Sequence, residues 1–255
     1  MSIYLDHNAT SPLRPSVAAA MAEIAHLPLN PSSIHRMGRE AKKRLEDARK
    51  TIADALSVFP NEILFTASGT EANNMALRGF PNHALLVSAV EHASILKLAE
   101  QLGASILPVD ATGLVQLDIL EAQLASLNRP ALVSVQLANN ETGVIQPMAD
   151  IATITRKHGA LLHADAVQAL GKLPLDMGLI GADMLTFCAH KAGGPVGVGA
   201  LVLHNDLAIK PLLIGGGQEL GRRAGTEPLA PIIGLAALLR EPLQTSTELR
   251  DYLEA

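Results

Sequence analysis

The chain has 255 residues, a mass of 26.8 kDa and a hydrophobic content of 48%, which suits one large folded domain and excludes a disordered chain. Its net charge of −5 argues against a nucleic-acid-binding protein, which would carry a basic excess. The longest apolar run, Leu229 to Leu239, contains Pro231 and is shorter than a membrane-spanning helix. The first residues do not resemble a secretory signal, and the single cysteine, Cys188, fits a reducing compartment. We therefore expect a cytoplasmic protein with neither nucleic acid nor membrane as a partner.

Helical and extended patterns alternate along the chain. Apolar residues spaced three and four apart predict helices at residues 16–25, 38–56 and 117–127. Short aliphatic runs bounded by turn residues predict buried strands at residues 63–66, 85–89, 105–109, 131–136, 161–164, 184–188 and 201–204. This alternation predicts a doubly wound α/β domain with a mostly parallel sheet flanked by helices.

The two ends of the chain do not follow this alternation. Residues 1–15 carry Pro12 and Pro15, and residues 245–255 begin like a capped helix. We predict that residues 1–15 are the N-terminal segment of a small domain, that 16–243 form the large domain, and that 244–255 start the C-terminal part of the small domain. The sequence looks cut short at Ala255, with the small domain largely missing.

Polar residues follow several of the predicted strands. In open parallel sheets, ligands bind at the carboxyl ends of the strands. Gly69 and Thr70 follow the first strand and open a helix, a pattern that fits an anion cradle but also an ordinary helix cap. Further polar residues at this edge, each after a later strand, are His92, Asn140, Asp165, Gln168, His190 and Lys191.

This set of groups suits pyridoxal 5'-phosphate. That cofactor needs a lysine for a Schiff base, a carboxylate beside the ring nitrogen and a cradle for its phosphate. One strand–helix–strand unit separates Asp165 from Lys191, so the two side chains would reach opposite parts of one ring.

Three other interpretations are weaker. The glycines at 193, 194, 197 and 199 do not reproduce a dinucleotide-binding fingerprint. His163 and Asp165 share one strand face, but the sequence offers no third metal ligand nearby. Cys188 ends a buried strand, which favours an inert thiol over a nucleophile.

The sequence resembles the cysteine desulfurases of the NifS/IscS type, within the class V aminotransferase family. The motifs that carry the resemblance run in family order across nearly the whole chain. They are Tyr4-Leu5-Asp6-His7-Asn8-Ala9-Thr10, Gly69-Thr70-Glu71-Ala72-Asn73-Asn74, Glu91-His92, Asn139-Asn140-Glu141-Thr142-Gly143, His163-Ala164-Asp165-Ala166-Val167-Gln168, Ala189-His190-Lys191 and Gly215-Gly216-Gly217-Gln218-Glu219 through Arg223-Ala224-Gly225-Thr226.

The resemblance implies the large domain of a PLP-dependent transferase, of the aspartate aminotransferase-like fold. It implies that Lys191 holds the cofactor and moves protons, while Asp165 pairs with the ring nitrogen. His92 would stack on the ring and serve acid–base steps. Gln168 would bond the ring hydroxyl, with Asn140 near that hydroxyl and the substrate carboxylate.

The resemblance also implies a phosphate site and a homodimer. Gly69, Thr70 and His190 would bind the phosphate, and Thr226 would reach it from the other subunit. Cys188 stands where the family typically has a phosphate-binding serine. A thiol is a weaker donor, so we expect some loss of cofactor affinity.

The implied activity converts L-cysteine to L-alanine and passes persulfide sulfur to iron–sulfur cluster assembly or thiolation. The partner would be a sulfur acceptor or an iron–sulfur scaffold protein. The nucleophilic cysteine loop of the family would lie beyond Ala255, so we expect this chain to be inactive or incomplete. Two alternatives stay open: a non-catalytic PLP-binding dimerising protein, and another class V lyase or transaminase such as a selenocysteine lyase. The Asn-Asn-Glu-Thr-Gly and Gly-Gly-Gly-Gln-Glu segments favour a desulfurase over that second alternative.

Overall fold

The computed structural model describes residues 3–28, 30–204 and 206–242. Its helices are α1 (Pro15–Ala25), α2 (Arg36–Leu56), α3 (Gly69–Arg78), α4 (Ala93–Leu102), α5 (Leu117–Ala125), α6 (Met148–Lys157), α7 (Met177–Ile180) and α8 (Leu229–Arg240), with 3₁₀ helices η1 (Pro60–Glu62), η2 (His190–Ala192) and η3 (Gln218–Gly221). Its strands are β1 (Ile63–Thr66), β2 (Ala84–Ser88), β3 (Ser105–Leu107), β4 (Ala131–Gln136), β5 (Leu161–Asp165), β6 (Met184–Cys188) and β7 (Gly199–Leu203). The helix expected from residue 245 lies outside the described residues.

One sheet organises the described part of the chain. Its strand order is β1-β7-β6-β5-β4-β2-β3, and β7 runs antiparallel to both of its neighbours. All other neighbouring pairs are parallel, which confirms the predicted mostly parallel sheet. Strands β1, β4 and β6 have the predicted bounds. Strand β3 is shorter than expected because Pro108 follows it and has no N–H for the ladder.

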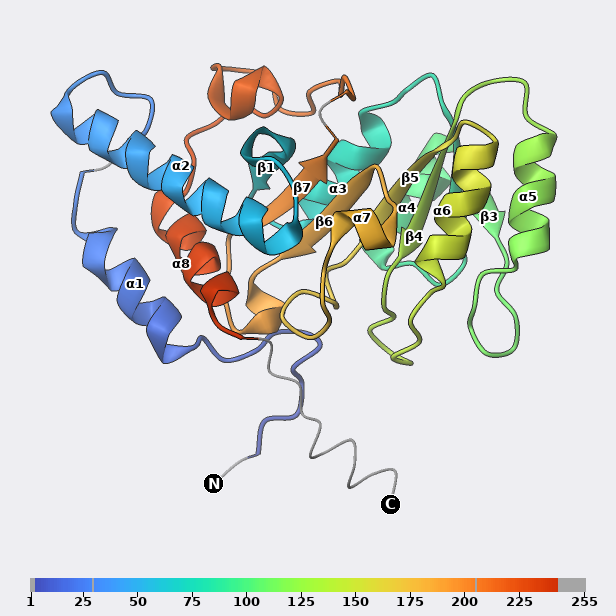
Figure 1. Cartoon of the computed structure of the whole chain (residues 1–255), viewed down its shortest axis with the longest axis horizontal. Coiled ribbons are helices and arrows are strands. Elements are labelled where there is room, and N and C mark those ends of the chain that lie inside the picture. Colours follow the sequence, from blue (N-terminus) through green and yellow to red (C-terminus); the bar gives the residue numbers. More distant parts are fainter. Residues whose placement is uncertain (1–2, 29, 205, 243–255) are drawn as a thin grey trace.

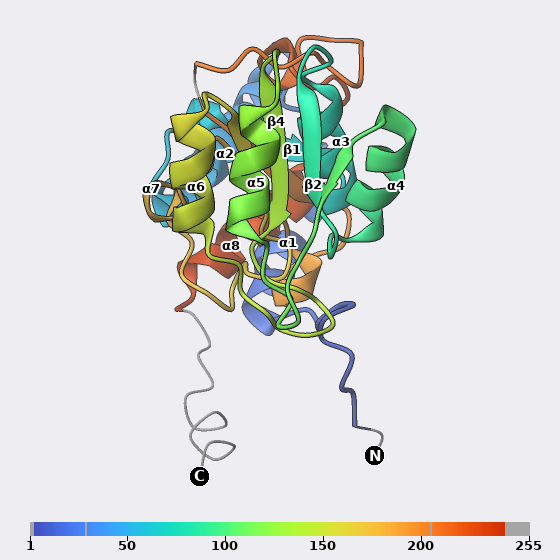
Figure 2. The same cartoon turned by 90° about the vertical axis from the view of Figure 1, so that its right-hand side faces the viewer.

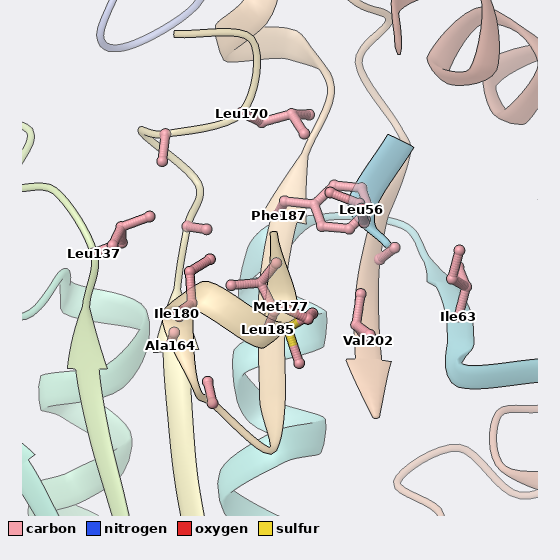
Figure 3. Close-up of a cluster of buried hydrophobic side chains, with 14 of the residues drawn as sticks. Leu56, Ile63, Leu137, Ala164, Leu170, Met177, Ile180, Leu185, Phe187 and Val202 are labelled. Carbon is pink, nitrogen blue, oxygen red and sulfur yellow. The ribbon is translucent and has the colours of Figure 1, made fainter. Parts of the chain in front are cut away.

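Two apolar layers cover the sheet. Helices α3 and α4 pack on one face, while α2, α5, α6, α7 and α8 pack on the other (Figures 1 and 2). Strand β7 serves both layers, because Ala200 and Val202 join one cluster and Leu201 and Leu203 join the other. Figure 3 shows the larger layer, where Leu56 of α2 and Met177 of α7 approach Leu185, Phe187 and Val202. Most polar residues predicted for a site lie beyond the ends of the strands, outside these two apolar layers.

The longest apolar run of the sequence is a core helix. It forms α8, which packs against α1 and α2, with Pro231 in its first turn, where a missing N–H costs no helical hydrogen bond. Among the described residues, no helix has both the length and the apolar character that crossing a bilayer requires.

Candidate active site

A cavity of about 320 Å³ opens where the parallel strands end. It brings together nearly all the residues predicted from the sequence: Gly69, Thr70, His92, Asn140, Asp165, Gln168, Cys188, His190 and Lys191. Further lining residues that the prediction did not include are Ala9, Ser68, Asn73, Ser94, Gln136, Ala138 and Val167. Segments from five strand ends therefore converge on one space.

Asp165 lies on the cavity wall at the end of β5, and its side chain is buried. Oδ1 accepts a hydrogen bond from the Val167 N–H at 2.9 Å, and Oδ2 accepts one from Asn73 Nδ2 at 2.8 Å. Burial raises the pKa of this carboxyl, although both hydrogen bonds oppose the rise. A cation at the cavity would therefore find a carboxylate that is already oriented.

The cradle at the start of α3 is built from backbone. Ser68 caps the helix by accepting from Glu71 N–H at 3.1 Å, and the first N–H groups of a helix have no partner within it. A Cβ on Gly69 would lie 2.7 Å from Val167 Cγ2, and one on Gly199 would lie 3.0 Å from Gly69 N. Glycine is thus required at both places for the cradle to lie against β7 and the loop after β5. The result is an N-terminal helix end facing the cavity, a site suited to an anion.

Lys191 lies on η2, directly after β6. The N-terminal segment holds this turn from outside: Ser11 N–H donates to the His190 carbonyl at 2.8 Å, and Ser11 Oγ donates to the Lys191 carbonyl at 3.1 Å. Figure 1 shows this segment passing the edge of the sheet beside the short helix after β6. The backbone of Lys191 is therefore fixed at the cavity that this residue lines.

Cys188 ends β6 and is buried. Burial raises the pKa of its thiol to about 11, so the reactive thiolate is scarce at neutral pH. This supports the interpretation of Cys188 as an inert thiol.

His92 is the N-cap of α4, and its Nδ1 accepts a hydrogen bond from Ser94 N–H at 3.1 Å. Ser94 Oγ lies 2.9 Å from the same nitrogen and accepts from Asn73 Nδ2 at 2.9 Å. Asn73 and Ser94 line the cavity but were not predicted as site residues from the sequence. For Asn73 a signal existed: it lies one turn into α3, on the helix that opens with the predicted cradle.

Gln168 is held by two residues outside the predicted set. Its Nε2 donates to the Asn8 carbonyl at 2.9 Å, and its Oε1 accepts from Lys172 Nζ at 2.8 Å. Lys172 Nζ also donates to Asn8 Oδ1 at 3.1 Å, and Asn8 Nδ2 donates to the Asn140 carbonyl at 2.8 Å. No sequence signal pointed to Lys172, because residues 167–172 form turns and the i, i+4 pairing of side chains belongs to helices.

Two buried titratable groups that do not line the cavity have shifted pKa values. His163 bonds Ser134 Oγ and Thr186 Oγ1, each at 2.9 Å, and burial lowers its pKa to about 3. Burial, with the nearby charge of Asp165, raises the pKa of Glu91 to about 8. Within the described ranges no cluster of three or more His, Cys, Asp or Glu could hold a metal ion, so the alternative metal site at His163 and Asp165 gains no third ligand.

The comparisons with known proteins point in one direction. A family model described as "Aminotransferase class-V" matches residues 3–246. The chain is 43% identical to an "IscS-like cysteine desulfurase" of Mycobacterium tuberculosis, covering 91% of this chain and 63% of that protein. It is 40% identical to a "Cysteine desulfurase IscS" of Dictyoglomus turgidum, covering 98% and 68%. The chain belongs to the class V aminotransferase family.

Solved structures agree with this family assignment. A NifS-like protein from Rickettsia africae superposes with a TM-score of 0.93 at 39% identity, over 100% of this chain and 74% of that one. A structure titled "SspA in complex with cysteine" gives 0.90 at 31% identity, over 99% and 77%. The predicted resemblance to NifS/IscS-type proteins and the predicted fold are confirmed. The chain spans about two thirds of the length of these curated relatives.

One predicted residue of this family member lies outside the cavity. Thr226 is exposed, on the segment that follows η3. Arg223 on that segment pairs with Glu71 at the start of α3, with Nε to Oε1 at 2.8 Å. The ion pair ties the Thr226 segment to the cradle helix of the same subunit. A contact of Thr226 across a dimer interface stays a prediction.

Proposed function

We propose that this chain is the cofactor-binding part of a PLP-dependent cysteine desulfurase. The observation that carries the proposal is one cavity lined by an oriented buried carboxylate, Asp165, by an amine, Lys191, and by the anion cradle at the start of α3. These are the three groups that pyridoxal phosphate requires.

The residues present fit that cofactor. The cradle at Gly69 and Thr70 tolerates no Cβ at Gly69, so its backbone N–H groups remain open to a phosphate. Asp165 would hold the pyridinium nitrogen, because a buried carboxylate gains most from a cationic partner. Lys191 would hold the cofactor aldehyde through its amine. When bound, pyridoxal phosphate supplies an electron sink for the bonds around the α-carbon of an amino acid.

The remaining lining residues would orient the ring and the substrate. His92 would lie over the ring face and exchange protons at Nε2, because its Nδ1 is occupied by Ser94. Gln168 would donate its second N–H to the ring hydroxyl, since the first is given to Asn8. Asn140 would bind the substrate carboxylate, and His190 the phosphate. L-cysteine as substrate is supported by the relatives named cysteine desulfurase and by the neighbouring structure in complex with cysteine.

The sulfur-transfer step needs a second group. The family's sulfur acceptor is a nucleophilic thiol, and the one cysteine of these 255 residues is Cys188, which is buried with a raised pKa. We propose that this chain binds the cofactor but forms little or no sulfide or alanine from L-cysteine by itself. The sulfur would pass, in a full desulfurase, to an acceptor or iron–sulfur scaffold protein.

We further propose a homodimer in the cytoplasm. Ile214 and Leu220, on the same segment as Thr226, are 93% and 71% exposed, and large exposed apolar residues of this kind favour an interface. A second copy would bring Thr226 to the phosphate. The single cysteine fits a reducing compartment.

Reconstitution with pyridoxal phosphate tests the proposal. We expect the dialysed chain to be yellow and Lys191→Ala to be colourless, while the exposed control Lys97→Ala keeps its colour. A colourless wild-type chain, or a Lys191→Ala variant of unchanged colour, would refute the cofactor assignment. Brisk release of alanine from L-cysteine would refute the proposed lack of turnover and would return Cys188 to consideration.

A further inference from the structure

A line of hydrogen bonds joins Asp165, which would bind the nitrogen of a bound ring, to His92, which would lie over the face of that ring. Asp165 Oδ2 accepts from Asn73 Nδ2 at 2.8 Å, and the same nitrogen donates to Ser94 Oγ at 2.9 Å. Ser94 Oγ in turn lies 2.9 Å from His92 Nδ1. Both intermediate side chains line the cavity, so the line runs along the cavity wall from β5 through α3 to α4.

The available donors and acceptors fix the orientation of each side chain in this line. The amide group of Asn73 donates one hydrogen bond to Ser94 Oγ and one to Asp165 Oδ2. Its buried Oδ1 has no hydrogen-bond partner among the described residues. Turning the amide over would set Oδ1 against the carboxylate oxygen of Asp165, acceptor against acceptor. The side chain is therefore oriented by its donors, at the expense of an unsatisfied carbonyl.

The hydroxyl of Ser94 has its direction fixed as well. Because Ser94 Oγ accepts from Asn73, its own hydrogen is free to donate to His92 Nδ1. The Ser94 backbone N–H donates to the same nitrogen at 3.1 Å. Nδ1 of His92 thus faces two donors and can only accept.

We propose that Asn73 and Ser94 are positioning residues that set His92 in its Nε2–H tautomer and hold its ring in register with the Asp165 carboxylate. We call the hydrogen bonds from Asp165 through Asn73 and Ser94 to His92 the bridge. The bridge forms without the cofactor, so the space between His92 and Asp165 is preorganised for a ring. It leaves Nε2 as the nitrogen of His92 that can give a proton to a reacting group. This inference rests on the proposed cofactor site for its use, but not for its geometry.

The tautomer is measured in the cofactor-free chain. Nitrogen-15 shifts of labelled histidines separate Nδ1–H from Nε2–H forms, and the His92 signal is assigned by its loss in His92→Gln. We expect wild-type His92 to be in the Nε2–H form. Ser94→Ala, which keeps the backbone N–H, should move the tautomer ratio about fivefold toward Nδ1–H, the equivalent of one hydrogen bond of about 1 kcal/mol.

Matched variants separate positioning from general damage. Ser94→Thr keeps a hydroxyl and should restore the wild-type ratio. Ser126→Ala removes a hydroxyl that bonds the Gln123 carbonyl, and Asn74→Ala removes an amide that bonds the Thr70 carbonyl. Neither control should move the His92 signals. An Nδ1–H tautomer in the wild type, or a ratio unchanged in Ser94→Ala, overturns the inference.

A second arm measures pyridoxal phosphate affinity by equilibrium dialysis. Ser94→Ala and Asn73→Ala should each weaken binding about fivefold, and Ser94→Thr should not. Failure of the wild-type chain to bind would count against the proposed function, whereas the tautomer result would still decide the bridge. If the wild-type chain binds pyridoxal phosphate and both Ser94→Ala and Asn73→Ala bind it with wild-type affinity, the bridge is overturned and the cofactor assignment stands.

Discussion

The ion pair between Arg49 of α2 and Glu219 of η3 anchors the segment that carries Arg223 and Thr226. Arg49 Nη2 lies 2.7 Å from Glu219 Oε1 and Nη1 lies 2.9 Å from Oε2, with the side chains 9% and 1% exposed. Glu219 Oε2 also accepts from Phe65 N–H at 2.9 Å. Glu219 has a φ of 47°, an unfavourable region for a non-glycine residue, so its conformation depends on these contacts.

Replacing Glu219 with glutamine keeps the shape and removes the charge. Breaking one side of a buried pair costs about 3–5 kcal/mol, because the remaining charge is left in a poor solvent. Arg49 keeps a contact to Glu46 at 3.2 Å and to the Ile63 carbonyl at 2.7 Å, which places Glu219→Gln at the lower end. We expect a loss of about 3 kcal/mol in the free energy of unfolding, or roughly a hundredfold in the unfolding constant.

Urea unfolding of a double-mutant cycle checks this value. Arg49→Met combined with Glu219→Gln should cost less than the sum of the single changes, because the double variant leaves no buried charge unpaired. The control is Arg44→Met on the same helix, which removes partly exposed pairs with Glu40 at 2.8 Å and with Glu23 at 3.7 Å and should cost at most about 1 kcal/mol. Equal losses for Glu219→Gln and Arg44→Met, or strict additivity in the cycle, would refute the argument.

Three further predictions concern the cavity. Burial raises the pKa of Glu91 to about 8 from 4.5, so the folded chain keeps a proton that the unfolded chain has lost. The free energy of unfolding should therefore fall by about 1.4 kcal/mol for each pH unit as the pH rises from 4.5 to 8. Glu91→Gln should remove this slope in urea titrations. A slope that is unchanged in Glu91→Gln would count against a buried neutral carboxyl. Cys188→Ser should strengthen pyridoxal phosphate binding about fivefold in dialysis, since a hydroxyl donates better than a thiol; weaker binding would contradict a phosphate contact there. Lys172→Met should lower the affinity for pyridoxal phosphate several-fold, because it removes the hydrogen bond that holds the Gln168 amide, and Lys172→Arg should largely restore that affinity. Wild-type affinity in Lys172→Met would show that the amide needs no support.

The order of elements was predictable because hydrophobic periodicity reports which face of each element is buried. The strands β1, β4 and β6 were predicted with their observed bounds, since each is a short aliphatic run between turn residues. Residues that directly follow such strands, among them His92 and Lys191, were placed at one sheet edge by topology alone.

Residues that act through other side chains could not be predicted in the same way. Asn73 and Ser94 lie on α3 and α4, and nothing in their local sequence shows that the two helices meet over Asp165. Likewise, Arg49 and Glu219 are separated by 170 positions. Their pairing depends on how α2 packs on the sheet.

By itself the amino-acid sequence indicated the strands, the helices α1, α2 and α5, the sheet class and the polar residues at the strand ends, because periodicity and turn chemistry act over a few residues. Tertiary structure alone decided which of these groups are oriented and how: the Asn73–Ser94 bridge, the Lys172 support of Gln168 and the buried Arg49–Glu219 pair. A hydrogen bond depends on distances of a few tenths of an ångström between distant segments, and such distances are set only when the whole core packs.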